Sequence, residues 1–365
     1  MTTSALNIIL DQLEHDCILD GESRVFCFSY EVGRGFEDFS GERAIDMPWP
    51  ELVVMKASDP RAKLVGEGWR LEYLTNDALT REAASTRNKS CSAAPVLRSS
   101  FSKHDYLRAV SRALEYIRAG DIYQVNLAQR LEVKNTRSPA EVFERLCAIS
   151  PAAYGAMIDL GEVQLLCNSP EVFLDITVDA KGTRRIINRP IKGTRPNLPG
   201  MYEELLTSEK DRAELAMIVD LQRNDLGRVC ETGSVKVTSA RELETQGKVI
   251  HGVASVEGVL LKGMSLSEIM RASFPCGSIT GCPKIRAMQI VEELEPVARG
   301  PYCGTIGVVR PDGSMTLNVA IRSMLLHAGT AYVYVGGGIV ADSDAESEYQ
   351  ETLVKARAML EALGE

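Results

Sequence analysis

Strand-like segments follow one another along this chain without helices between them. Between residues 305 and 340 the runs TIGVV, SMTLNVAIRSMLL and AYVYVGGGIV are all β-rich, and YQVNLAQRLEV, YGAMIDL and EVQLLCN occupy much of residues 123–168. Parallel strands need long crossover connections, so strands that neighbour each other in sequence favour antiparallel sheets. We therefore predict an α+β fold, with antiparallel sheets and helices packed outside them.

Three helices are predicted around these strands. One begins after Ser102, with Asp105 at the spacing of a capping box and apolar residues recurring at helical intervals beyond it. A second spans residues 208–230. A third runs to the C-terminus, and Ser343 and Glu346 are placed to cap its start.

Composition excludes several classes of function. The 365 residues carry a net charge of -9, which argues against nucleic-acid binding because that calls for a basic face. No apolar run approaches the roughly 18 residues of a membrane span, and the N-terminus lacks the basic region of a signal peptide. Nine cysteines are scattered without a C-x-x-C pair, which is typical of reduced thiols. We expect a cytoplasmic protein with no membrane contact.

The predicted helices carry carboxylates at a spacing that places them on one face. Asp211 and Glu214 are three residues apart, as are Glu348 and Glu351, and Lys355 follows four residues later. Exposed helices often carry such charges, so solvated surface is the simpler interpretation for either helix alone. If the two faces converge, they form an oxygen-rich site suited to Mg²⁺.

Other polar groups lie beside predicted strands. Gly336, Gly337 and Gly338 end a strand pattern, where glycine permits either a β-bulge, the favoured interpretation, or close approach of a ligand. Arg322 falls within a buried-looking strand and needs an anion, either a ligand carboxylate or an internal acid. His251, in VIHGVAS, is as readily explained as a hydrogen-bonded core residue.

Two further segments are rich in structure breakers. Lys192 lies between a proline and a glycine in RPIKGTRP, where a solvated surface lysine is the ordinary interpretation. In FPCGSITGCPKIRAM a glycine-rich turn precedes a helix, and exposed backbone amides of such a turn suit an anion.

Many of these segments together resemble one enzyme family. NSPEVFL, RPIKGTRP, DRAELAMIVDLQRNDLGR, IHGVAS, FPCGSITGCPKIRAM, YCGTIGVV, NVAIRSM, GGGIVADSDAESEYQET and KARAM occur in the order found in the chorismate-utilising enzymes. The resemblance covers roughly residues 100–362. It implies a sandwich of two antiparallel sheets with helices outside. We expect residues 1–97 to form a shortened N-terminal region that contributes strands, and residues 98–365 to form the chorismate-binding catalytic region.

The resemblance also implies a Mg²⁺ site and a chorismate site. Its metal ligands correspond to Glu214 and Glu351, with Glu348 and Asp211 at the site or acting through water. A tyrosine and an arginine hold the enolpyruvyl carboxylate with help from glycine amides, a glycine and a threonine contact the ring, and a lysine neutralises the metal shell. The implied chorismate-binding residues are Gly193, Thr194, Ser278, Tyr302, Arg322, Gly336, Gly337, Gly338 and Lys355.

Three residues are implied in chemistry. Glu171 matches the general acid that protonates the departing C4 hydroxyl. His251 matches a histidine tied to elimination in anthranilate synthases. Lys192 corresponds to a lysine in aminodeoxychorismate synthases, where anthranilate synthases carry a small residue. Its amine attacks ring C2 as the C4 hydroxyl leaves, and ammonia then displaces it at C4.

The position of Gln124 narrows the choice further. Members of the family that use water as a nucleophile have a lysine there, and glutamine cannot act as a general base. The resemblance therefore implies component I of an aminodeoxychorismate synthase, supplied with ammonia by a separate glutamine amidotransferase subunit. Two alternatives are component I of an anthranilate synthase, and a non-catalytic subunit that binds chorismate without turnover.

Overall fold

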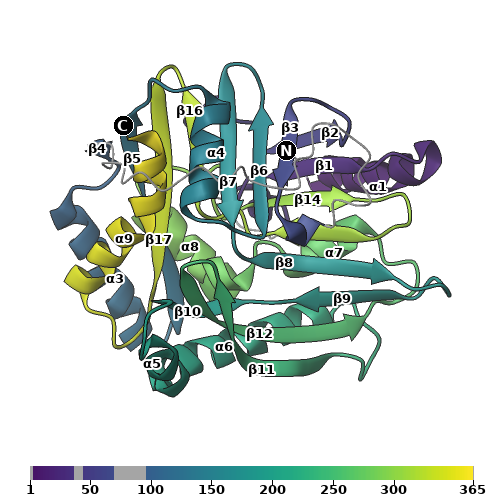
Figure 1. Cartoon of the computed structure of the whole chain (residues 1–365). Helices are drawn as coiled ribbons and strands as arrows, with labels where there is room; N and C mark the ends of the chain where they lie inside the picture. The colour runs from purple at the N-terminus through teal and green to yellow at the C-terminus, as the bar shows by residue number, and fades with distance from the viewer. Residues whose placement is uncertain (1–2, 37–43, 70–95, 365) are drawn as a thin grey trace.

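Two antiparallel sheets form the framework of the computed structural model, which describes residues 3–36, 44–69 and 96–364 (Figure 1). The first sheet has nine strands, and β11 (Lys236–Gln246) pairs with β12 at its side. Its order is β10 (Ile191–Pro196), β12 (Val249–Val259), β9 (Arg184–Asn188), β8 (Val172–Val178), β15 (Met315–Asn318), β14 (Thr305–Val309), β1 (Arg24–Phe28) and β2 (Leu52–Lys56).

The second sheet has eight strands, and β4 (Val96–Ser99) pairs with β5. Its order is β13 (Gly281–Cys282), β5 (Gln124–Lys134), β17 (Thr330–Ile339), β16 (Ser323–His327), β7 (Val163–Ser169), β6 (Tyr154–Asp159) and β3 (Ala62–Val65). The predicted α+β sandwich of two antiparallel sheets is confirmed.

Helices cover the sheets from outside. They are α1 (Thr3–Asp20), α2 (Val32–Phe36), α3 (Lys103–Arg118), α4 (Pro139–Ile149), α5 (Met201–Thr207), α6 (Glu209–Gly227), α7 (Leu266–Ser273), α8 (Lys284–Leu294) and α9 (Ala345–Leu363). Two short 3-10 turns are η1 (Glu67–Trp69), which follows β3, and η3 (Gly277–Ile279), which lies between α7 and β13. Helices α4 and α9 contact each other and the eight-stranded sheet, whereas α6 packs on β10, β11 and β12.

Side-chain caps fix where several helices begin. The hydroxyl oxygens of Ser102 and Ser208 accept hydrogen bonds from backbone N–H groups three residues later, at the starts of α3 and α6. At α9 the cap is Asp344, which accepts from the backbone N–H of Ser347. The prediction of Ser343 as this cap is wrong by one residue, because the Ser343 hydroxyl instead donates to Glu348 Oε1 at 2.6 Å.

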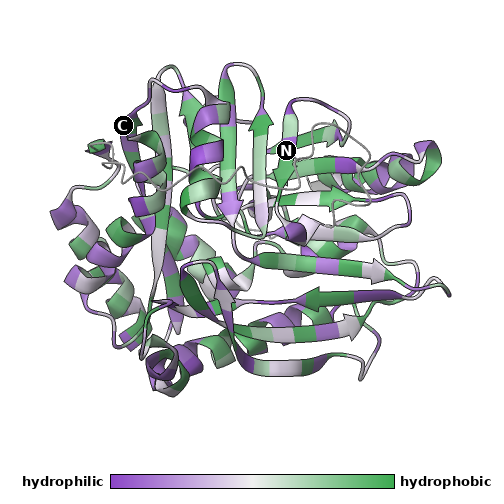
Figure 2. Ribbon diagram, viewed as in Figure 1, coloured by the Kyte–Doolittle hydropathy of each residue, from purple (hydrophilic) through white to green (hydrophobic). Residues whose placement is uncertain are grey.

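Apolar side chains form two buried clusters. The larger one joins residues of both sheets with α1, α7 and α8. The smaller one lies between the outer face of the eight-stranded sheet and helices α4 and α9, and Phe143, Val333 and Met359 are among its members. Figure 2 shows the alternation of apolar and polar residues that this layering requires along the strands.

Three local predictions need correction. The run from 314 to 326 is two strands in different sheets, β15 and β16, so Arg322 lies in the crossing between them with a φ of 52°. The glycines at 336–338 form no bulge, because β17 pairs with β5 in unbroken register. Of the predicted loop at 76–100, residues 76–95 lie outside the described residues, and 96–99 form β4.

The N-terminal part of the chain joins both sheets. Strands β1 and β2 belong to the nine-stranded sheet and β3 to the eight-stranded sheet. The division after residue 97 stays a prediction. The cysteines in the described ranges are all free. Over those same ranges, no helix has the length and apolarity that crossing a membrane would need.

Candidate active site

Lys192 lies in a β-bulge of β10, where the pairing with β12 departs from the regular hydrogen-bond ladder. Strands β10 and β12 pair with a register shift between Ile191 and Thr194, so Lys192 and Gly193 together face Gly252 of β12. Gly193 has a φ of 79°, which favours glycine. A Cβ on Gly252 would lie 2.5 Å from the carbonyl oxygen of Lys192, so glycine is needed on both strands. Bulges of this kind re-aim a side chain relative to its strand.

The re-aimed amine of Lys192 reaches the glycine run of β17. A Cβ built on Gly338 would lie 3.4 Å from Lys192 Nζ and 3.4 Å from the side-chain amide carbon of Gln124. Burial lowers the pKa of Lys192, the carboxylate of Glu214 opposes this shift, and the ammonium of Lys355 adds to it. The ammonium of Lys192 therefore loses its proton more readily than that of a surface lysine.

Glu171 is a second buried titratable group that acts electrostatically on Lys192. It lies buried in the turn between β7 and β8, and the backbone N–H of Ile191 donates to its Oε1 at 3.4 Å. Burial raises the pKa of Glu171 to about 7, against the opposing effects of Ser278 and Lys192. A carboxyl group that keeps its proton near neutral pH can act as a general acid.

His251 is held in its uncharged form. Its Nδ1 lies 2.8 Å from the hydroxyl oxygen of Thr194 across the β10–β12 pair, so the two groups share a hydrogen bond. Burial lowers the pKa of His251 to about 4, and the guanidinium of Arg322 adds to the shift. Near neutral pH the ring can accept or donate a hydrogen bond but does not carry a charge.

Arg322 and Tyr302 provide groups suited to a carboxylate. In the part of the chain that the structure describes, no hydrogen bond or ion pair engages the half-buried guanidinium of Arg322. The buried Tyr302 ring stacks on Tyr334 at 5.6 Å, and its hydroxyl oxygen lies 3.0 Å from where a Cβ on Gly336 would be. A cation without a protein anion is suited to an anionic ligand.

The first turns of α9 place the carboxylates of Glu348 and Glu351 close to Gly337 of β17. A Cβ on Gly337 would lie 3.1 Å from Glu348 Oε2 and 3.9 Å from Glu351 Oε1. Burial raises the pKa of Glu348, and a hydrogen bond from Ser343 opposes this. Burial also acts to raise the pKa of Glu351, but Lys355, 2.7 Å away, together with Lys210 and Lys192 holds the pKa below its usual value.

The carboxylates of α6 have different surroundings. Asp211 forms an ion pair with Arg195 at 3.0 Å, and it also lies close to Gly193. Glu214 is 3.9 Å from Lys210, and burial raises its pKa. Lys192 and Glu351 both act on Glu214 electrostatically, so the two helix faces converge toward the same region.

The carboxylates at the start of α9 fit a Mg²⁺ ion that has few protein ligands. Among residues 3–36, 44–69 and 96–364, no three His, Cys, Asp or Glu side chains are grouped closely enough to hold a metal ion by themselves. Mg²⁺ is usually bound by one or two carboxylates, with waters and substrate oxygens completing its octahedron. Glu348 and Glu351, which approach one point above Gly337, match that donor set.

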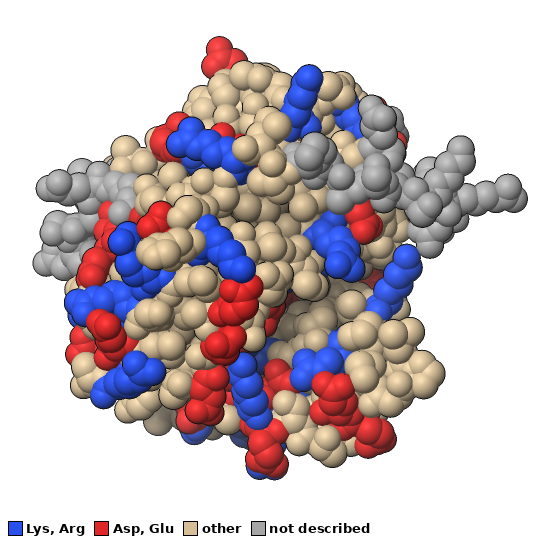
Figure 3. All heavy atoms as spheres, turned by 90° about the vertical axis from the view of Figure 1, so that its left-hand side faces the viewer, with Lys and Arg blue, Asp and Glu red and all other residues tan. Residues whose placement is uncertain are grey.

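Lys355 and Ser278 complete the set of predicted residues. Lys355 Nζ donates to the carbonyl oxygen of Gly336 at 2.9 Å, which ties α9 to β17. Ser278 is buried in η3, and its hydroxyl lies 3.3 Å from the thiol of Cys276. The space-filling view shows acidic and basic side chains interspersed around a hollow on the face that carries α3, α5 and α9 (Figure 3).

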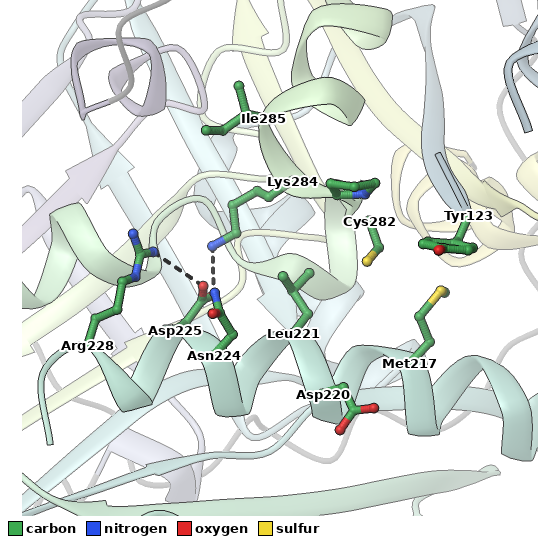
Figure 4. Close-up of a pocket in the computed structure, with 11 residues that line it drawn as sticks. Tyr123, Met217, Asp220, Leu221, Asn224, Asp225, Arg228, Cys282, Lys284 and Ile285 are labelled. Carbon is green, nitrogen blue, oxygen red and sulfur yellow. Dashed lines mark hydrogen bonds and ion pairs between the residues drawn. The ribbon is translucent and has the colours of Figure 1, made fainter. Parts of the chain in front are cut away.

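One cavity lies apart from the predicted site residues, and a second one is lined by His251. A cavity of about 740 Å³ lies between α6 and the start of α8, and none of the predicted site residues lines it (Figure 4). Asp225 and Lys284 lie in its wall and form a buried ion pair of 2.7 Å that sequence reasoning missed. A second cavity of about 260 Å³ is lined by His251, Ile191 and Pro170, the last two directly preceding Lys192 and Glu171.

Comparisons with known proteins match one family over most of the chain. The family described as chorismate binding enzyme matches residues 8–361. The chain is 44% identical to anthranilate synthase component 1 of Thermus thermophilus over 269 residues, 72% of this chain and 57% of that protein. It is 36% identical to aminodeoxychorismate synthase component 1 of Klebsiella aerogenes over 360 residues, 92% of this chain and 76% of that protein. The chain thus spans little more than half the length of its anthranilate synthase relatives.

Solved structures share the fold. Anthranilate synthase component I from Streptococcus pneumoniae superposes with a TM-score of 0.78 at 29% identity, covering 98% of this chain and 85% of that one. An isochorismate synthase of Bacillus anthracis superposes with a TM-score of 0.71 at 19% identity, covering 99% of this chain and 90% of that one.

Proposed function

This chain belongs to the family of chorismate-binding enzymes, and we propose that within the family it is component I of an aminodeoxychorismate synthase. The observation that carries the proposal is the half-buried amine of Lys192, which the bulge of β10 aims at Gly338 beside Gln124. The similarity to the Klebsiella aminodeoxychorismate synthase also extends over 92% of the chain, against 72% for the Thermus anthranilate synthase.

In the first step, the uncharged amine of Lys192 forms a bond to C2 of chorismate. The C4–O bond breaks as the ring double bonds shift, and the proton of Glu171 passes to the departing oxygen, which leaves as water. The new secondary ammonium then loses one proton. The raised pKa of Glu171 and the lowered pKa of Lys192 favour the two protonation states that this step needs.

In the second step, ammonia attacks C4 and the C2–N bond to Lys192 breaks. The double bonds shift back, the added nitrogen gives up one proton, and the departing lysine nitrogen takes up one proton, which regenerates the lysine amine. The product is 4-amino-4-deoxychorismate. Splitting a 1,4-exchange into two displacements is the advantage of a covalent nucleophile.

Binding groups surround these reacting atoms. Arg322 and Tyr302 would hold the enolpyruvyl carboxylate, and the Gly336–Gly338 amides would support it. Mg²⁺, held by Glu348 and Glu351 with Glu214 nearby, would neutralise and anchor the other carboxylate. His251, kept neutral, would orient Thr194 toward the ring.

The source of ammonia is proposed to be a separate glutamine amidotransferase subunit. The relatives are named as component 1 of their synthases, which supports a second component. The free and mostly buried cysteines support a cytoplasmic location for such a pair.

The test is a product assay with purified protein, chorismate, Mg²⁺ and ammonium salt, run with and without an aminodeoxychorismate lyase. We expect p-aminobenzoate that depends on the lyase. Fluorescent anthranilate formed without lyase would instead assign the chain to the anthranilate synthases, which the 44% identity to the Thermus protein favours. Absence of turnover, with chorismate binding retained, would indicate a non-catalytic subunit.

A further inference from the structure

Three buried polar side chains form a row of hydrogen bonds that ends at Glu171. Gln222 Nε2, on α6, donates to Cys276 Sγ at 3.6 Å, and this sulfur lies 3.3 Å from Ser278 Oγ. The hydroxyl of Ser278 in turn forms a side-chain hydrogen bond with the carboxyl group of Glu171. The four residues are at most 5% exposed, so bulk water does not reach these contacts.

The turn that carries Cys276 and Ser278 packs closely against α6. A Cβ on Gly277 would lie 2.5 Å from Leu221 Cδ2 and 3.2 Å from Gln222 Nε2, so glycine lets the turn approach the helix. Within the described ranges, the contact with Cys276 is the one hydrogen bond of the Gln222 side chain, because its Oε1 is unpaired. Packing between the turn and α6 therefore holds the amide N–H against the thiol.

The direction of these hydrogen bonds follows from the donors. An amide N–H can only donate, so the sulfur of Cys276 accepts the bond from Gln222. Burial raises the pKa of the Cys276 thiol to about 12, so the sulfur keeps its own proton and can donate it to Ser278 Oγ. The hydroxyl proton of Ser278 is then free for Glu171. If Ser278 donated to the sulfur instead, the carboxyl group would lose this bond.

The hydroxyl of Ser278 assists the release of a proton. A hydrogen bond donated to a carboxyl group favours its charged form. In the reaction the proton of Glu171 passes to the departing oxygen, and the carboxylate that remains accepts the bond from Ser278. The backbone N–H of Ile191 donates to the same carboxyl group, and Lys192 in its charged form also favours the carboxylate.

We propose that Cys276 and Gln222 are positioning residues for proton donation, because they direct the hydroxyl of Ser278 onto Glu171. The inference rests on the proposed function in taking Glu171 as the proton donor to the C4 oxygen. It holds for either amination product, since the C4–O bond breaks on the way to both.

The test compares Cys276→Ala with Cys17→Ala, which removes another buried, hydrogen-bonded thiol from α1. The kcat/KM for chorismate consumption is measured between about pH 6 and about pH 9, on both sides of the titration of Glu171. We expect Cys276→Ala to lose about threefold to tenfold at the acidic end, the scale of one hydrogen bond. Its alkaline limb should move up by about half a pH unit to one pH unit, because the carboxyl group holds its proton more tightly.

Two controls separate positioning from a general structural loss. Cys276→Ser restores a donor to Ser278 and should return the rate and the limb toward the parent. Cys17→Ala should leave the limb in place, because a structural loss lowers kcat/KM by one factor at every pH. An alkaline limb of Cys276→Ala that coincides with the parental limb would overturn the inference.

Gln222→Met serves if Cys276→Ala does not fold. It keeps the length of the side chain and removes the amide donor, so the limb should move in the same direction, and an unmoved limb contradicts the proposed role. The infrared band of the protonated Glu171 carboxyl, identified by its loss in Glu171→Gln, gives the same titration without turnover. A product other than aminodeoxychorismate would contradict the proposed function and leave this comparison of titrations unaffected.

Discussion

Lys192 and the surface lysines of the chain share a side chain but differ in their surroundings. Lys236 is exposed on β11, whereas the amine of Lys192 is turned inward by a bulge and lies among Glu171, Glu214 and Gln124. Burial shifts the pKa of a lysine downward because the charged form loses water. The lowered pKa of Lys192 is thus a property of its position.

Replacing Lys192 by alanine should remove the covalent step. We expect formation of aminodeoxychorismate to fall on the order of 10³-fold or more, the scale of losing a covalent nucleophile, while Lys236→Ala retains parental activity. The measurement is lyase-coupled p-aminobenzoate formation with ammonium as nitrogen source. A Lys192→Ala protein as fast as its parent would rule out the lysine adduct.

Glu171 should set the alkaline side of the pH profile. Its pKa is raised to about 7, so it is protonated below that pH and loses the catalytic proton as the pH rises through it. Deprotonation of Lys192 acts in the opposite direction and favours the rate as pH increases. We expect kcat/KM to decline above about pH 7. Glu171→Gln should lose about 100-fold or more in rate and also lose that decline; an alkaline limb that persists in this variant would assign it to another group.

At the scale of elements, the bulge in β10 depends on one glycine. An alanine at Gly193 would keep a φ of 79° and bring its Cβ within 2.7 Å of Leu205 Cδ1 and 2.9 Å of Asp211 Cγ. Gly182, in the turn before β9, has a φ of 78° and nothing within 4 Å of its Cβ position. Alanine substitutions at Gly182 and Gly193 therefore separate the cost of backbone strain from the cost of crowding.

We expect Gly182→Ala to lower the free energy of unfolding by about 1–2 kcal/mol, the cost of a left-handed alanine, without loss of activity. Gly193→Ala should cost more than that and also reduce turnover, because it displaces the residue next to Lys192. Chemical denaturation measures the free energy of unfolding, and the lyase-coupled assay measures turnover. Equal losses for the two variants would show that no close contact constrains the bulge.

Helices α6 and α8 are joined by the buried pair of Asp225 and Lys284 in the wall of the larger cavity (Figure 4). The Lys284 ammonium also donates to the carbonyl oxygen of Ser273 at 2.6 Å. Lys284→Met leaves the buried Asp225 carboxylate with only the half-exposed Arg228, 3.4 Å away, as an ionic partner. Removing one partner of a buried pair typically costs 3–5 kcal/mol, and we expect a loss in the free energy of unfolding of about 3 kcal/mol because Arg228 remains. The double variant Asp225→Leu/Lys284→Met should recover most of the loss in urea denaturation, and a single variant as stable as the parent would contradict this account.

At the scale of the molecule, the site is assembled from both sheets and two helices. Strand β10 brings Lys192, β17 brings its glycines, α6 brings Glu214 and α9 brings Glu351. None of these elements holds a metal ion alone, so the bound ion should stabilise the whole arrangement. We expect chelation to abolish turnover and added Mg²⁺ to restore it. We also expect Mg²⁺ to raise the Tm of the parent more than that of Glu351→Gln; an equal shift would place the ion elsewhere.

Sequence patterns predicted the elements better than their connections. Helical periodicity and Ser102 located α3 correctly, because a helix cap acts over three residues. The β-rich run of residues 314–326 predicts one continuous strand that contains Arg322, yet the chain crosses from one sheet to the other there. The glycines of β17 suggested a bulge, but they keep the ladder regular and leave room for Tyr302, Glu348 and Lys192.

The sequence by itself determined the fold class and the family, because both follow from local propensities and from motifs in a fixed order. It also supplied the candidate site residues, by resemblance. The tertiary structure decided which charges share a space: the bulge aims Lys192 inward, Asp211 pairs with Arg195, and Gln124 is left buried and unpaired. Burial and pairing between segments far apart in the chain set these properties, since a pKa or an unsatisfied hydrogen bond depends on neighbours that only folding brings together.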